Sequence, residues 1–237
     1  MKIIDIKTTI VNAEMRNWVF VKVITDSDLY GWGEATVEWK TRAVVGAIED
    51  LKPLLVGKDP RNIKQNFQIM TKHGFWKLGV IGMSAVSGIE HALWDILGKS
   101  LNTPVWQLLG GKVREKIKIY THLGMGDMNA VYRDTMETNK LNDHASALVE
   151  KGYKAFKVVF IPFTHFTNSS QNLNKVNELM SSLRNTVGDD IDIMVDFHGR
   201  CASGISSIQY IKELETYNPL FVEEPILPGD NKTLLQI

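Results

Sequence analysis

Apolar and polar residues alternate along the first part of the chain. Residues 2–11, 18–25 and 30–36 are also rich in β-branched and aromatic side chains, and this combination predicts three strands. Ser27 and Asp28 lie between the second and third of these segments, where they predict a hairpin turn. The amino-terminal part therefore begins with a small sheet.

After Glu38 the apolar residues recur at three- and four-residue steps, which is typical of helices. The first such stripe predicts one helix, with Pro53 near its end (Ala43, Ala47, Leu51, Leu54 and Leu55). A second stripe predicts a buried helix that ends near Gly98 (Met83, Val86, Ile89, Leu93, Trp94 and Leu97). Strands followed by helices predict a compact α+β unit over residues 1–115, which closes near Gly110 and Gly111.

Beyond Gly111 the predicted strands and helices alternate strictly. Strands are expected at residues 117–123, 156–160, 191–197 and 220–224, with helices between them at residues 136–151, 173–187 and 205–214. This order is typical of a parallel sheet with helical crossovers. A doubly wound sheet and a (β/α) barrel share it, so the pattern leaves both architectures open.

Composition narrows the class of protein. The 27 basic and 27 acidic residues cancel, which argues against a nucleic-acid binder. Cys201 is the single cysteine and cannot form an internal disulfide, which favours a reducing, cytoplasmic location. There is no run of 18 apolar residues to span a membrane, and the amino-terminal stretch reads as a strand rather than a signal peptide. The expected partner is a small molecule.

Charged residues follow the predicted strands at the edge where parallel sheets bind ligands. Asp196 and His198 end the third strand of the second part, Glu223 and Glu224 end the fourth, and Lys157 lies in the second. Neighbouring strands are about 4.8 Å apart, so the carboxylates of Asp196 and Glu223 should repel each other unless a cation lies between them. Mg²⁺ suits such an oxygen site because it leaves coordination positions open for a substrate.

Other interpretations of the same residues stay open. Acidic residues at strand ends also serve as helix N-caps or as solvated loop charges. His198 could be structural, although its position beside a candidate metal ligand favours an acid–base role. Glu224 should face away from Glu223 if the strand continues, so we interpret it as a supporting residue. Residues 124–126 form only a weak glycine-rich phosphate loop, and no nucleotide-binding motif accompanies them.

Five segments resemble the enolase superfamily, and within it the mandelate racemase subgroup. They are GWGEA (31–35), SAVSGIEHALWDILGK (84–99), NTPVWQLLGG (102–111), VDFHGR (195–200) and VEEP (222–225). The last two resemble the galactonate dehydratase-like members in particular. The resemblance implies an α+β capping domain over residues 1–115, followed by a modified (β/α) TIM-like barrel. Residues 116–237 would then form about the first four βα units of that barrel.

The resemblance also implies roles for individual residues. Asp196 and Glu223 match two Mg²⁺ ligands, and His198 matches the acid that protonates the leaving hydroxyl. Lys157 matches the first lysine of a catalytic K-x-K motif, whose second lysine is replaced here by Val159. That replacement argues against a racemase with a lysine base on this strand.

Residues 12–18 and 37–40 correspond to the family's substrate lid. Within these segments Trp18 and Glu38 are expected to contact the substrate.

The activity implied is Mg²⁺-dependent dehydration of a sugar acid. Removal of the proton α to the carboxylate gives an enediolate that requires a divalent metal, and elimination of the β-hydroxyl, which leaves poorly unless protonated, gives a 2-keto-3-deoxy acid. The alternatives are a catalytically dead remnant or binding protein, or another superfamily reaction such as racemisation or cycloisomerisation. The sequence does not distinguish galactonate from gluconate or arabinonate.

The family places a third metal carboxylate on the fifth barrel strand and its base on later strands. The sequence reaches only Ile237, shortly after the fourth predicted strand. We therefore expect these residues to be part of a longer enzyme, to be inactive alone, and to belong to a homo-oligomer at full length.

Overall fold

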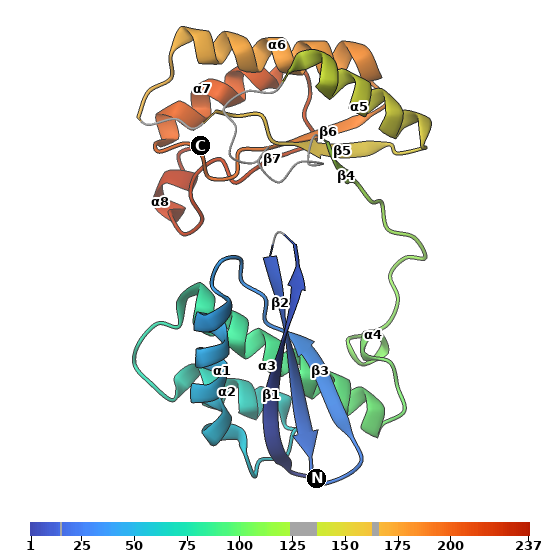
Figure 1. The fold of residues 1–237 in the computed structure, drawn as a ribbon, viewed down its shortest axis with the longest axis vertical. Coiled ribbons are helices and arrows are strands. Elements are labelled where there is room, and N and C mark those ends of the chain that lie inside the picture. Colours follow the sequence, from blue (N-terminus) through green and yellow to red (C-terminus); the bar gives the residue numbers. More distant parts are fainter. Residues whose placement is uncertain (15, 124–136, 163–165) are drawn as a thin grey trace. The chain divides into compact units, whose positions relative to one another are not determined.

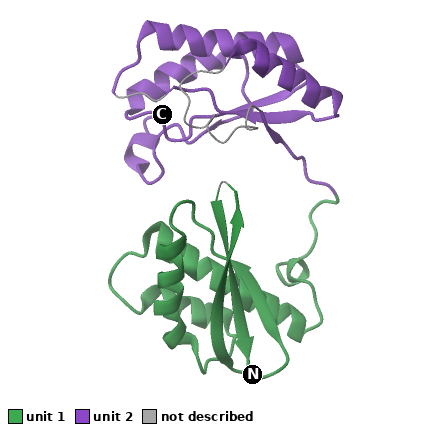
Figure 2. Ribbon diagram, in the orientation of Figure 1, with its two compact units in different colours: residues 1–115 green, residues 116–237 purple. Residues whose placement is uncertain are grey.

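The computed structural model describes residues 1–14, 16–123, 137–162 and 166–237. The chain forms two compact units, Met1–Glu115 and Lys116–Ile237 (Figure 2). Among the described residues, no helix is both long and apolar enough to cross a membrane.

The first unit contains a three-stranded antiparallel sheet in the order β1–β2–β3 (Figure 1). The strands are β1 (Ile3–Ala13), β2 (Arg16–Thr25) and β3 (Tyr30–Glu34). The predicted hairpin between the second and third strands is confirmed, and Thr25 organises its turn. The Thr25 hydroxyl donates a hydrogen bond to the Leu29 carbonyl at 2.6 Å and lies 2.8 Å from the Ser27 hydroxyl.

Helices cover one face of this sheet: α1 (Thr41–Leu55), α2 (Ile63–Lys72) and α3 (Gly79–Ser100), followed by the short α4 (Val105–Leu108). Alternate residues of β2, from Val19 to Val23, are fully buried against α1 and α3. The apolar spacing had not singled out α2. It is short, and its three buried residues include the polar Asn66.

Strand β3 packs against α3 at backbone distance. A Cβ atom at Gly33 would lie 1.9 Å from the carbonyl oxygen of Gly88, and one at Gly31 would lie 1.9 Å from that of Ala92. Both contacts are with backbone atoms of α3, which cannot rotate away as a side chain could. Glycine is therefore required at these positions because the strand and the helix touch there.

The second unit contains a four-stranded parallel sheet in the order β4–β5–β6–β7 (Figure 1), so the predicted parallel pairing is confirmed. The strands are β4 (Thr121–Leu123), β5 (Ala155–Val158), β6 (Asp192–Asp196) and β7 (Val222–Glu223). They are shorter than expected at both edges. Hydrogen bonds between the β6 and β7 segments nevertheless extend back to Leu220, whose amide donates to the Ile193 carbonyl at 2.8 Å.

Three amphipathic helices, α5 (Thr138–Glu150), α6 (Ser170–Val187) and α7 (Gly204–Glu215), pack on one face of the parallel sheet, and α8 (Asn231–Leu234) follows β7. Phe156 and Val158 on β5, and Ile193 and Val195 on β6, belong to the same buried cluster as the helices. Because successive side chains of a strand point to opposite faces, Lys157, Met194 and Asp196 point to the other face.

A tight loop connects α1 to α2. The Arg61 guanidinium donates two hydrogen bonds to Asp59, at 3.0 and 2.7 Å, and the Arg61 amide donates a third at 2.9 Å. The pKa of the Asp59 carboxyl is lowered to about 2, and the main cause is the hydrogen bonding from the Arg61 side chain.

Replacing Gly33 with Ala should destabilise the first unit by at least about 2 kcal/mol, because the new methyl group overlaps the backbone of α3. Gly46 in α1 is a matched control, since a Cβ there meets nothing within 4 Å. Gly46→Ala should be neutral or should stabilise by about 0.5–1 kcal/mol through helix propensity. Urea unfolding followed by circular dichroism measures both changes. Equal stability of the two variants would show that the close approach is absent.

The Asp59–Arg61 contact should make the stability of the first unit pH-dependent. The pKa of Asp59 in the folded protein lies below its ordinary value of 3.8, so its contribution is complete above that value and is lost as the pH falls toward 2. The free energy of unfolding of wild type minus that of Asp59→Asn should therefore be constant above about pH 5 and decline between about pH 4 and 2. Denaturant titrations across this range measure the difference. A difference that grows on acidification would contradict the assignment.

Candidate metal and acid–base site

Three charged side chains meet at the carboxyl ends of β5, β6 and β7. Asp196 lies directly opposite Glu223 in the β6–β7 register, as the sequence predicts for neighbouring strands. The Lys157 ammonium reaches both, with its Nζ atom 2.9 Å from Asp196 Oδ2 and 2.6 Å from Glu223 Oε2. One cation thus lies between two carboxylates, which is what the repulsion between them requires.

Burial makes this arrangement electrostatically demanding. The side chains of Lys157 and Asp196 are 7% and 4% exposed, and that of Glu223 is 34% exposed. Burial by itself lowers the pKa of Lys157. The hydrogen bonds to Glu223 and Asp196, with the charges of both carboxylates, outweigh burial and raise the pKa above its ordinary value. Lys157 is therefore a cation at neutral pH.

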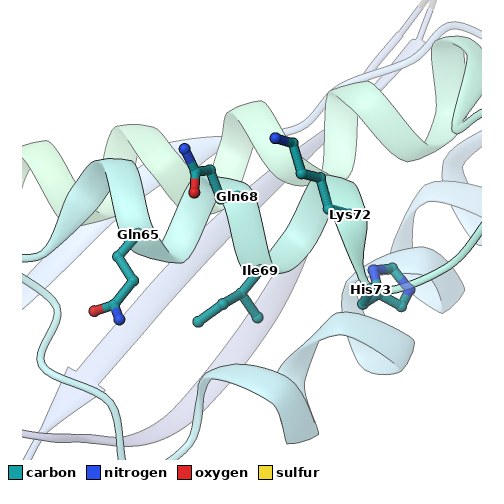
Figure 3. A pocket seen from close by; sticks show the side chains of 5 residues that line it. All are labelled: Gln65, Gln68, Ile69, Lys72 and His73. Atoms are coloured by element: carbon teal, nitrogen blue, oxygen red, sulfur yellow. The ribbon is translucent and has the colours of Figure 1, made fainter.

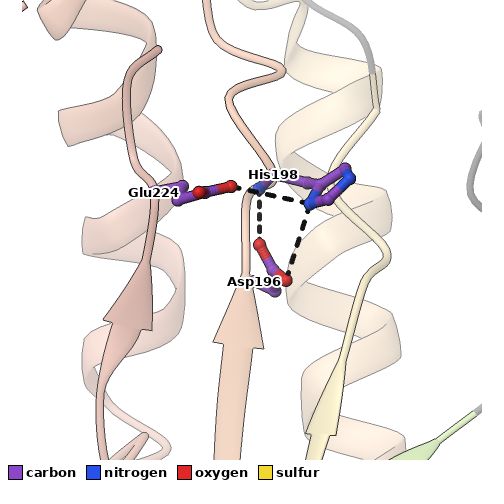
Figure 4. Close-up of side chains that lie close together, drawn as sticks. All are labelled: Asp196, His198 and Glu224. Carbon is purple, nitrogen blue, oxygen red and sulfur yellow. Dashed lines mark hydrogen bonds and ion pairs between the residues drawn. The ribbon is translucent and has the colours of Figure 1, made fainter. Parts of the chain in front are cut away.

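His198 lies beside this group, but outside strand β6. Strand β6 ends at Asp196, and His198 adopts a positive φ of 52°. The Asp196 carboxylate stabilises this turn, because its Oδ1 accepts a hydrogen bond from the His198 amide at 2.7 Å. The imidazole Nδ1 is 3.7 Å from Asp196 Oδ2 and 3.6 Å from Glu224 Oε2 (Figure 4).

Glu224 does not follow the alternation on which its expected orientation depended. Strand β7 ends at Glu223, and Glu224 has a φ of 45°, so the backbone turns at this residue. Its carbonyl accepts a hydrogen bond from the Gly199 amide at 3.1 Å, and its carboxylate approaches His198. An acidic residue directly after a strand was the available signal, but sequence alone does not reveal a positive φ at a non-glycine residue.

The donor atoms present suit a hard divalent cation. Atoms of Asp196, His198 and Glu224 that could bind a metal lie within 4.8 Å of one another, and Glu223 shares the Lys157 ammonium with Asp196. Carboxylate oxygens dominate this set, which favours Mg²⁺ or a similar ion over a softer metal.

Arg200 is a further residue near this site, and its role was not predicted. It is buried, and its Nη1 donates a hydrogen bond to the Ile161 carbonyl at 2.5 Å. The bond ties the turn after β6 to the segment after β5. The sequence HGR alone does not indicate whether its arginine is buried or exposed, so the burial of Arg200 could not be predicted.

The predicted lid residues Trp18 and Glu38 lie in the first unit. Glu38 forms an ion pair with Arg16 at 2.6 Å, which joins the start of β2 to the segment before α1. Trp18 is 45% exposed and packs edge-to-face on Phe20. Substrate contact by these two residues stays a prediction. The glycine-rich residues 124–126 lie outside the described residues.

A hollow of about 370 Å³ lies along α2 in the first unit (Figure 3). Its lining consists of Gln65, Gln68, Ile69, Lys72 and His73. This set contains no carboxylate, so it offers no site for Mg²⁺. The charged group at the ends of β5 to β7 is the stronger candidate.

Two family models match the chain in consecutive segments. Residues 2–110 match the mandelate racemase / muconate lactonizing enzyme N-terminal domain, and residues 140–237 match the enolase C-terminal domain-like family. A D-galactonate dehydratase from Klebsiella pneumoniae (strain 342) is 41% identical over 210 residues, which are 89% of this chain and 52% of that protein. The chain thus spans about half the length of this curated relative.

Solved structures agree in fold. A member of the enolase superfamily from Salmonella Typhimurium matches with a TM-score of 0.90 at 30% identity, over 99% of this chain and 64% of that one. An enolase from Pantoea ananatis with bound D-gluconate and Mg matches with a TM-score of 0.83 at 29% identity, over 99% of this chain and 62% of that one. The α+β unit, the parallel sheet and both matched domains agree, and the chain belongs to the mandelate racemase / muconate lactonizing enzyme group of the enolase superfamily.

Proposed function

We propose that this chain carries part of the active site of a Mg²⁺-dependent dehydratase that acts on a sugar acid. The observation that carries the proposal is the meeting of Asp196, Glu223 and Lys157 at adjoining strand ends, with His198 beside them. The identity of 41% to a D-galactonate dehydratase supports this reaction class, and the D-gluconate and Mg in the Pantoea ananatis structure support the ligand class. The substrate would be a galactonate-like acid.

The parallel sheet would be half of a (β/α) barrel. Four strands of a flat sheet would put β4 and β7 about 14 Å apart. Yet the rings of Tyr120, just before β4, and Phe221, just before β7, pack edge-to-face with centroids 6.3 Å apart. Contact between side chains of the two outermost strands supports a sheet that curves toward closure.

Asp196 and Glu223 would hold the metal. When bound there, Mg²⁺ supplies positive charge that favours loss of the proton α to the substrate carboxylate. The protein holds these two ligands at equal height because Asp196 and Glu223 are register partners. Lys157 would add a second positive charge for the carboxylate of the substrate.

His198 would donate a proton to the β-hydroxyl as it leaves. Its Nδ1 faces the carboxylates of Asp196 and Glu224, so Nε2 is the nitrogen that would face the substrate and carry the proton that is transferred. The positive φ of His198 brings the ring out of the strand, where its side chain is 38% exposed. Trp18 and Glu38 would contact the distal end of the acid as parts of the lid.

The metal site can be tested by replacing one ligand. Asp196→Asn should weaken binding of Mg²⁺, or of Mn²⁺ as a spectroscopic substitute, by more than about tenfold. Asp192→Asn is the matched control, since Asp192 lies on the same strand and pairs with Lys118 away from the site. Isothermal titration measures the affinity for Mg²⁺, and electron paramagnetic resonance measures the affinity for Mn²⁺. Equal affinity in both variants would remove Asp196 from the ligand set.

The acid role of His198 can be separated from metal binding. In any preparation that turns over a sugar acid, His198→Asn should lower kcat for dehydration by at least about 100-fold. Binding of Mg²⁺ should stay largely intact, because Asp196 and Glu223 remain in place. Formation of 2-keto-3-deoxy acid from galactonate, gluconate and arabinonate measures the first quantity. An unchanged kcat would show that His198 is not the acid.

A further inference from the structure

We propose that the Lys157 ammonium and the metal replace each other at a single position. The ammonium acts as a built-in counter-ion for Asp196 and Glu223, and Mg²⁺ binds by displacing it. We call this replacement the exchange. This inference rests on the proposed metal site and goes beyond it. It assigns Lys157 a role in keeping the ligand pair intact before any metal arrives.

The ammonium occupies the place that a shared metal ion would need. Its Nζ contacts Asp196 Oδ2 and Glu223 Oε2 at 2.9 and 2.6 Å. Mg²⁺ bonds oxygen at about 2.0–2.1 Å, so an ion bonded to both of these oxygens would bring two further positive charges close to the ammonium. A protonated lysine offers no lone pair and cannot itself become a ligand. The two cations therefore compete for the same pair of carboxylate oxygens.

Lys157 cannot simply leave for solvent. Phe156 and Val158, its neighbours on β5, are fully buried, and the backbone of β5 is paired with β4 and with β6. Its side chain starts from the interior of the sheet and is only 7% exposed. On displacement the ammonium would move by rotation of its flexible stem and would stay close to the ligand pair.

The exchange explains how two acidic groups can lie opposite each other in a folded chain before the metal arrives. Removing one partner of a buried ion pair is strongly destabilising, because the remaining charge keeps its burial and loses its partner. Two uncompensated carboxylates would repel as well. A metal carrying two positive charges can take over the role of the lysine, whereas an uncharged side chain cannot.

The test compares Lys157→Met with wild type, with and without metal. In EDTA the variant should melt at least about 5 °C lower. In saturating Mg²⁺ this deficit should shrink to within about 1 °C, because the metal now compensates both carboxylates. Isothermal titration should show Mg²⁺ binding about tenfold more tightly to the variant, since no ammonium has to be displaced. Lys140→Met, which removes an exposed ion pair with Glu137, is the control and should change none of these quantities.

The outcomes separate this inference from the metal site itself. If wild type binds Mg²⁺ but Lys157→Met binds it no more tightly, or stays equally destabilised in saturating Mg²⁺, the exchange is wrong and the metal site stands. If neither protein binds Mg²⁺, both are wrong.

A second variant keeps the test decisive if Lys157→Met does not fold. Lys157→Met with Glu223→Gln removes the lysine together with the repulsion. It should recover most of the melting temperature in EDTA while losing at least about tenfold in Mg²⁺ affinity relative to wild type. Failure of this double variant to recover stability would also overturn the exchange.

Discussion

Two carboxylates on adjacent strand ends, one buried and one half-buried, are the constraint on which the second unit depends. Asp196 and Glu223 are register partners, so the sheet itself holds them close together. Their repulsion has to be met from within the same sheet, and Lys157 meets it from the neighbouring strand β5. The sheet therefore orders the charged group as well as the apolar core, and a shift of one residue in any of these three strands would separate the charges.

The two faces of the parallel sheet carry different tasks. Phe156, Val158, Ile193 and Val195 pack against α5, α6 and α7 and supply the apolar burial that stabilises the unit. The intervening positions carry Lys157 and Asp196, where chemistry is possible because packing is satisfied elsewhere. This division lets the strand ends hold charges that would be destabilising in an undivided core.

Much of the site follows from strand spacing. The features that strand spacing failed to predict each have a physical cause. Asp196 and Glu223 were predicted as neighbours because parallel strands end at one edge, and their register agrees. Glu224 was expected to face away because alternation presumes an extended backbone, which ends at Glu223. The contacts of Lys157 depend on the rotamers of a long side chain, which periodicity does not specify. Helix α2 went unpredicted because it buries only three residues, one of them polar.

The ion pair between Arg16 and Glu38 couples two segments that are 22 positions apart in sequence. Asn17 and Thr41 add a hydrogen bond of 3.5 Å between the same segments. A lengthened hairpin between β1 and β2 would therefore displace residues 37–40 as well. Because both side chains are partly exposed, the ion pair adds little to the free energy of unfolding, and its main consequence is to hold the two segments in one fixed relation.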